Sequence, residues 1–97
     1  MKSHPKPPKR IRDKKHMAAV REGGCCICGN PTADAHHLRY VGHGRGMGIK
    51  NGDNWTIPLC RDHHDQLHMF GDEKTFLDLH GIDGAELAKS LWRKRNE

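Results

Sequence analysis

Apolar residues along this chain form short clusters that predict a small α+β protein. At helical spacing they fall into four segments, each begun by a capping residue or ended by glycine. The predicted helices run from about Ile11 to Gly23-Gly24, from near Arg61 (with Asp62 as cap) to Gly71, over 72–80, and from an Asp83-x-x-Glu86 capping box to Trp92. The side chains expected to face inward from the last two are Phe76, Leu77, His80, Leu87, Ala88, Leu91 and Trp92.

Two shorter segments have the β-branched and aromatic composition of strands. Thr56–Leu59 predicts one strand, and Pro58 confines it to an edge or terminus of a sheet. The other is expected within 33–41, centred on Leu38, Tyr40 and Val41 and entered through His36-His37. Because neighbouring residues on a strand face opposite sides, one of these imidazoles can face the helix that begins near Arg61, and the other is then offset to the far side.

The composition favours a metal as the element that stabilises so short a chain. Of 97 residues, 34% are hydrophobic and 5% aromatic, so apolar burial is thin for an independent fold. Four cysteines and nine histidines offer ligands instead. The chain contains no recognisable signal peptide and no apolar run of membrane length, so we expect the reducing cytoplasm and metal binding rather than disulfides.

The cysteine spacing predicts a closed zinc site. Cys25 and Cys28 have the C-x-x-C spacing, and Gly29 supplies a turn that lets backbone amides face the sulfurs. Cys60 and His63 complete four tetrahedral ligands of a structural Zn²⁺. Cys26 is left over as a small thiol, and a register that uses Cys26 as ligand remains open.

Further histidines predict a second, open metal site. His64 and His68 are four residues apart, which places both imidazoles on one face of a helix. With His36 they supply three nitrogen ligands and leave positions for water and a phosphate oxygen, as a catalytic ion requires. His37 is then free to take a proton from the attacking water, and the predicted reaction is phosphodiester hydrolysis. By contrast His16 is interpreted as a surface or packing residue, because no ligand spacing connects it to a neighbour.

The charge distribution suits a nucleic acid. Residues 1–16 hold seven Lys or Arg against one Asp, whereas the remainder holds ten against eleven Asp or Glu. Pro5, Pro7 and Pro8 predict that residues 1–10 are a basic arm without stable structure of its own. The candidate phosphate contacts are Arg39 and, in a glycine-rich loop, Arg45 and Lys50. A merely solubilising terminus is the competing interpretation of the arm.

These motifs resemble the HNH endonucleases, whose ββα-metal motif is a hairpin and a helix around one divalent ion. Ala35-His36-His37-Leu38 resembles their first motif, and Leu59-Cys60-x-x-His63-His64 resembles the last. A three-histidine site is similar to that of the colicin-type nucleases. Through Trp92 the chain also looks like small phage and prophage HNH proteins related to the recombination-enhancement nucleases.

The resemblance implies a zinc-stabilised HNH domain over residues 11–97 that cleaves DNA. It further implies His37 as base, one catalytic ion (Mg²⁺, Mn²⁺, Ni²⁺ or Zn²⁺) on the three histidines, and a recombination or phage-packaging protein as partner. The family's middle Asn falls here on Trp55, so the residue that orients the base is Asn54, the adjacent Asp53 or a backbone carbonyl. Trp55 favours the alternative of a zinc-stabilised nucleic-acid-binding module with a degenerate nuclease site, and an RNA-directed nuclease or toxin is a third possibility.

Overall fold

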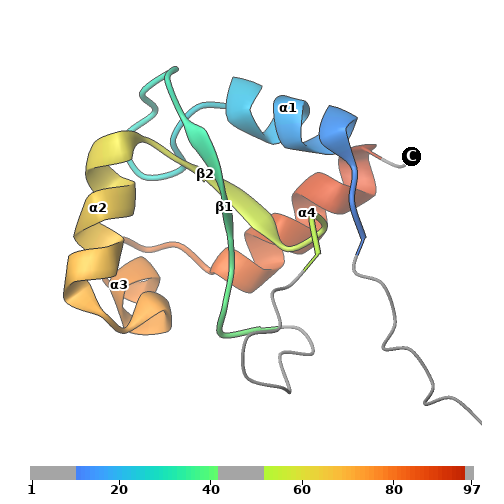
Figure 1. The fold of residues 1–97 in the computed structure, drawn as a ribbon. Helices are drawn as coiled ribbons and strands as arrows, with labels where there is room; N and C mark the ends of the chain where they lie inside the picture. The colour runs from blue at the N-terminus through green and yellow to red at the C-terminus, as the bar shows by residue number, and fades with distance from the viewer. Residues whose placement is uncertain (1–10, 42–51, 96–97) are drawn as a thin grey trace, which may run out of the picture.

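A computed structural model describes residues 11–41 and 52–95 of the chain and has the expected α+β class. The elements follow in the order α1 (Lys14–Glu22), β1 (Asp34–His37), β2 (Thr56–Leu59), α2 (Arg61–Phe70), α3 (Glu73–Leu79) and α4 (Gly84–Arg95) (Figure 1). The predicted basic arm (1–10), Arg45 and Lys50 lie outside the described residues. Within those residues, no helix has both the length and the apolar content that crossing a membrane requires.

Within residues 11–41 and 52–95 the sheet consists of one antiparallel pair, in which each strand pairs on one side. His36 lies opposite Ile57 and His37 opposite Thr56. Pro58 pairs with Ala35, and proline is tolerated there because an edge strand needs to bond on one side only, which confirms the predicted edge position. The Pro58 carbonyl accepts a hydrogen bond from the backbone N–H of Cys26 at 2.9 Å, so the cysteine loop is tied to β2.

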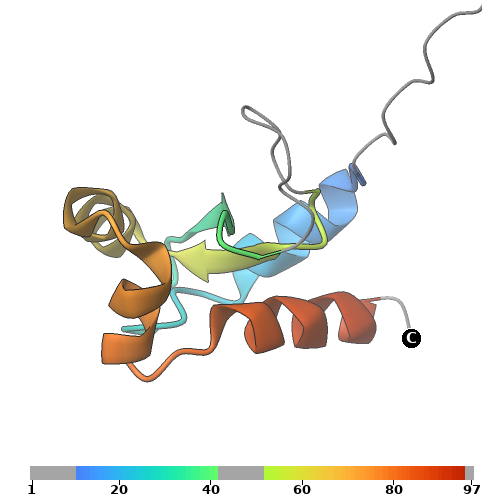
Figure 2. The same cartoon turned by 90° about the horizontal axis from the view of Figure 1, so that it is seen from below.

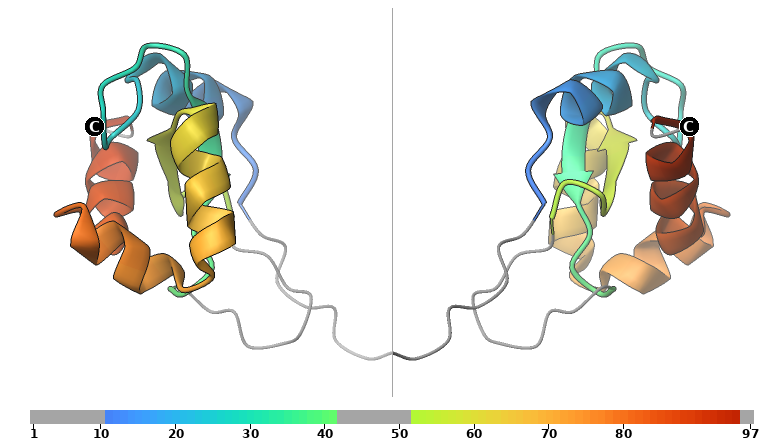
Figure 3. Two further views of the ribbon diagram at one scale, coloured as in Figure 1. Left: turned by 90° about the vertical axis from the view of Figure 1, so that its left-hand side faces the viewer. Right: turned by 90° about the vertical axis from the view of Figure 1, so that its right-hand side faces the viewer.

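The helices surround this strand pair. α1 contacts both strands, and α4 runs alongside β2 and also contacts α1 (Figure 2). α2 packs on β2 and on α3, and it stands in front of the strands in the left view of Figure 3. The core between these elements consists of Val20, Cys25, Leu38, Ile57, Leu59, Cys60, Leu67, Phe76, Leu77 and Ala88. Two of the expected zinc ligands are therefore themselves core residues.

The first strand lies earlier than predicted. β1 ends at His37, so both histidines are in the strand, and the prediction of a strand centred on Leu38 is wrong. Leu38 still donates its N–H to the Trp55 carbonyl at 2.8 Å, but the next two amides donate to the side chain of Glu73 instead of to β2. A carboxylate from α3 thus ends the pairing.

Three predicted helix details are also corrected. α1 begins at Lys14, because the Asp13 side chain accepts the N–H of His16 at 3.0 Å as an N-cap. At α2 the N-cap residue is Cys60, so Asp62 lies in the first turn and is not the cap. His80 follows the end of α3 and is exposed instead of inward, with its ring beside Phe76 at a centroid distance of 4.7 Å.

His16 proves to be a packing residue. Its side chain is 1% exposed and meets the Trp92 ring edge-on, at a centroid distance of 4.9 Å. Neither ring nitrogen has a hydrogen-bond partner within the described part of the chain. Burial lowers the pKa of His16 more strongly than the nearby Asp13 raises it, so the ring is neutral at pH 7.

The start of α4 provides a test of this packing. A Cβ on Gly84 would lie 2.9 Å from Leu77 Cδ1 and 3.0 Å from the Tyr40 hydroxyl, which is held in place by the Ala85 N–H. We expect Gly84→Ala to lower the free energy of unfolding by about 1–3 kcal/mol, measured by urea denaturation of the zinc-loaded protein.

Gly23→Ala is the matched control. There the added Cβ meets only the Val20 carbonyl at 3.4 Å, and the φ of −71° suits any residue. The control is expected to unfold within about 0.5 kcal/mol of the wild type or to be slightly more stable. Equal stability of the two variants would contradict the tight contact at Gly84.

Candidate metal centres

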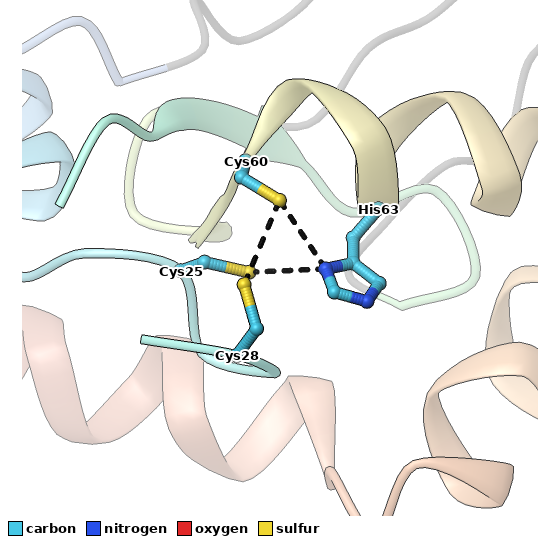
Figure 4. Close-up of side chains that lie close together, drawn as sticks. All are labelled: Cys25, Cys28, Cys60 and His63. Carbon is cyan, nitrogen blue, oxygen red and sulfur yellow. Dashed lines mark hydrogen bonds between the residues drawn. The ribbon is translucent and has the colours of Figure 1, made fainter. Parts of the chain in front are cut away.

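Cys25, Cys28, Cys60 and His63 come together as predicted. One ligand atom from each lies within 4.8 Å of all the others (Figure 4). The His63 Nδ1 is 3.2 Å from the Cys60 sulfur and 3.6 Å from the Cys25 sulfur, and the sulfurs of Cys28 and Cys60 are 3.8 Å apart. Tetrahedral zinc with bonds of about 2.3 Å to sulfur and 2.0 Å to nitrogen separates its ligands by roughly 3.5–3.8 Å. The four side chains therefore fit a zinc ion and leave it no open position.

Local backbone structure holds these ligands in place. The Gly29 N–H donates to the Cys25 carbonyl at 2.8 Å and closes the turn that contains Cys28, and the φ of 78° at Gly29 turns the chain back so that Asn30 accepts the N–H of Cys25 at 2.9 Å. Cys60 and His63 are three residues apart at the start of α2, so they project from the same side of its first turn.

The thiol environments distinguish the ligand Cys25 from its neighbour Cys26. Burial raises the pKa of Cys25, but hydrogen bonds from the amides of Cys28, Cys60 and Ile27 outweigh it and bring the pKa to about 6. At Cys26 burial raises the pKa to about 12. The cluster of ligand atoms contains Cys25 and Cys28 and not Cys26, so the register that uses Cys26 is not adopted.

His36, His64 and His68 form a second cluster, as expected from their spacing. Their ligand atoms also lie within 4.8 Å of one another. His36 comes from β1, and the other two lie one turn apart on α2, with their Nε2 atoms 3.2 Å from each other. The ring centroids are 5.0 Å apart for His36 and His64 and 6.1 Å for His36 and His68.

The electrostatics of this cluster favour metal-binding forms. Burial, and then the neighbouring imidazoles His36 and His68, lower the pKa of His64. Its ring is therefore neutral at pH 7, and neutral imidazole is the form that binds a metal. His36 is buried and His68 exposed, so the cluster extends from the core to the surface.

Sequence reasoning missed Glu73, which is bonded to His36. Its side chain is 8% exposed, and its Oε2 lies 2.5 Å from His36 Nε2. Burial raises the pKa of Glu73, but hydrogen bonds from His36 and from the amides of Arg39 and Tyr40 outweigh it, so the net shift is downward and the side chain is ionised. The sequence offers only one signal for this residue, an acidic side chain in the first turn of a predicted helix.

His37 contacts a second buried carboxylate. The Nε2 of His37 lies 2.8 Å from Asp53 Oδ1, and the other oxygen, Oδ2, accepts the N–H of Asp13 at 2.7 Å. Burial raises the pKa of Asp53, but these hydrogen bonds outweigh burial, so the net shift of the pKa is downward. Of the two side chains considered for orienting His37, Asp53 contacts its ring. Asn54, the next residue in the chain, is half-buried.

Arg39, a predicted DNA contact, lies next to this region. It is exposed and lines an open hollow of about 390 Å³ together with Tyr40 and residues 71–74, which include Glu73 and Lys74. Through Glu73 the hollow borders the histidine cluster.

Comparisons with known proteins give a family without an assigned activity. The family model described as "Protein of unknown function (DUF968)" matches residues 1–94. The chain is 44% identical over 77 residues to the uncharacterized protein YdfU of Escherichia coli (strain K12), a match over 76% of this chain and 21% of that relative. The chain thus spans about a fifth of the length of the relative. No solved structure matches it significantly.

The closed site predicts different outcomes for two cysteine substitutions. Cys28→Ser removes a ligand, so we expect the zinc content to fall from about one ion per chain to near none and the protein to unfold or aggregate, because such sites contribute on the order of 10 kcal/mol to folding. Cys26→Ser should keep both the zinc and the melting temperature. Atomic emission and thermal denaturation measure the two quantities. Loss of zinc in Cys26→Ser would contradict the ligand assignment.

Proposed function

Because the chain belongs to the DUF968 family of proteins of unknown function, we propose its function from the site itself: a metal-dependent DNA endonuclease of the HNH type. The observation that carries the proposal is the convergence of His36, His64 and His68 beside a closed cysteine site. Three nitrogen ligands leave coordination positions for water and substrate, whereas the four-ligand site leaves none. The two sites thus suit different tasks, one structural and one catalytic.

The order of elements also supports an HNH arrangement. An antiparallel strand pair is followed directly by a helix, and of the three clustered histidines one lies on the first strand and two on the helix. That is the arrangement the resemblance to the ββα-metal motif implies. The 17 Lys and Arg residues, with Arg39 beside the cluster, favour a polyanionic substrate.

His37 can act as the base because of its contact with Asp53. The ionised Asp53 carboxylate accepts a hydrogen bond from the N–H at His37 Nε2, so the lone pair of a neutral ring lies on Nδ1. Nδ1 then takes a proton from water as the water oxygen forms a bond to phosphorus and the ester P–O bond breaks. When bound to the three histidines, a divalent ion supplies charge stabilisation at the phosphate and at the leaving oxygen.

The role of the whole protein is a separate proposal. Since the chain spans about a fifth of its relative's length, further segments could select the substrate. A recombination or phage-packaging partner and a cytoplasmic location rest on the resemblance and on the free cysteines alone.

A nucleic-acid-binding module without catalysis is the second candidate. Trp55 at the position of the family's Asn favours it, but the Asp53 contact gives His37 an orienting group of another kind. The number of bound ions distinguishes the two functions. A single zinc under any loading with a second divalent metal would favour the binding module.

The base assignment predicts the effect of His37→Ala. Purified protein should nick or cut plasmid DNA in the presence of Mg²⁺, Mn²⁺ or Ni²⁺, and His37→Ala should slow cutting by about 10²–10⁴-fold, since the base is lost. The variant keeps all seven metal ligands, so its zinc content, second-metal affinity and melting temperature should match the wild type. Equal cutting by the two proteins would exclude His37, and competition with RNA would test the substrate class.

The orienting group is tested by Asp53→Asn against Asn54→Ala. In Asp53→Asn the side-chain carbonyl must face the Asp13 N–H, so the NH₂ group faces His37 Nε2 and moves the ring proton to Nδ1. We expect kcat to fall by about 10²–10⁴-fold with little change in KM. Asn54→Ala should keep most of the activity. The reverse ranking in single-turnover assays would assign the orienting role to Asn54.

A further inference from the structure

We infer that Glu73 is the positioning residue of the histidine metal site: its buried carboxylate holds the proton of His36 on Nε2, so that Nδ1 is left for the ion. This inference rests on the proposed function of the cluster as a site for a divalent metal. It assigns a role to α3, which contributes none of the three ligands.

Glu73 contacts a ligand without being one. Its Oε2 lies 2.5 Å from His36 Nε2, whereas the group of atoms within 4.8 Å of one another comprises the three histidines and not Glu73. A carboxylate on the remote nitrogen of a metal-binding histidine fixes the tautomer and orientation of the ring and raises its basicity as a ligand. The position of Glu73 matches that role.

The second oxygen of Glu73 fixes the carboxylate itself. Oε1 accepts the N–H of Arg39 at 2.7 Å and the N–H of Tyr40 at 3.0 Å. Both partners are backbone donors, and their positions are set by the turn that follows β1. Since α3 begins at Glu73, the short link Gly71-Asp72 brings this carboxylate from the end of α2 back to His36. The carboxylate therefore cannot rotate without losing these bonds.

This arrangement dictates the His36 tautomer. An ionised carboxylate can only accept hydrogen bonds, so a neutral His36 must carry its proton on Nε2. The lone pair of the ring is then on Nδ1, the nitrogen that Glu73 does not contact, and it is this nitrogen that the inference assigns to the ion. Protonation at Nδ1 would place a donor where an ion needs a lone pair.

Glu73→Gln should reverse the tautomer of His36 with almost no change in the shape of the side chain at position 73. The two backbone N–H groups require the glutamine carbonyl, so the NH₂ group must face His36 Nε2. His36 then becomes an acceptor at Nε2, and its proton moves to Nδ1. The substitution leaves Cys25, Cys28, Cys60 and His63 in place, so the zinc-stabilised fold is expected to remain.

The experiment uses the zinc-loaded full chain. ¹⁵N chemical shifts of the His36 ring without a second metal should report an Nε2–H tautomer in the wild type and an Nδ1–H tautomer in Glu73→Gln. Titration with Mn²⁺ or Ni²⁺ should give about 10–100-fold weaker binding at the second site of the variant. Glu86→Gln is the control, because Glu86 is exposed on α4, bonded to Lys89 at 2.9 Å, and should change neither quantity.

The outcomes separate this inference from the proposed function. A second ion bound equally by the wild type and by Glu73→Gln would overturn the role of Glu73 and leave the metal site standing. A wild type that binds no second ion would overturn both. An Nδ1–H tautomer in the wild type would overturn the inference whether or not the variant folds.

Discussion

The fold depends on bringing three sulfurs and an imidazole nitrogen to a single point. Without the ligands, the loop from Cys25 to Cys28 has one backbone bond to β2 and no helix or strand of its own. Sulfurs this close repel one another once ionised, and amide hydrogen bonds lower the pKa of Cys25 despite its burial. A cation at the centre removes that repulsion and joins the loop to α2. His64 and His68 follow on the same helix, so the two clusters share α2.

The contact of a histidine ring with a buried carboxylate occurs twice on β1. His36 and His37 point to opposite faces of the strand, and each contacts a buried carboxylate through Nε2, Glu73 at 2.5 Å and Asp53 at 2.8 Å. Each carboxylate also accepts backbone N–H groups from a neighbouring segment. These hydrogen bonds offset the cost of burying a charge, and they connect the orientation of each imidazole to the tertiary structure. One strand thus presents two imidazoles, each with its Nε2 against a buried carboxylate.

The two sets of metal ligands could be predicted because they contain pairs of residues that are close in the sequence. The role of Glu73 and the end of β1 could not, because they depend on contacts between distant residues. The C-x-x-C turn and the four-residue interval between His64 and His68 are fixed by backbone geometry, so the sequence alone indicates both. Glu73 is 37 residues from His36, and no periodicity connects them. That distant contact also ends β1 early, which explains why the strand predicted around Leu38 was misplaced. His80 was expected inside because helical spacing cannot show where a helix ends against solvent.

Trp55, which stands where the HNH endonucleases have Asn, is part of the turn that leads into β2. The Trp55 N–H donates to the Gly52 carbonyl at 3.0 Å, and its carbonyl accepts the N–H of Leu38, so the Trp55 backbone continues the strand pairing. The ring packs against the core. The Thr56 hydroxyl donates to the Asp53 carbonyl at 2.8 Å and holds the turn closed. An acidic side chain two residues before Trp55 is thereby brought to His37, so the orienting group can come from the turn while the strand position contributes packing.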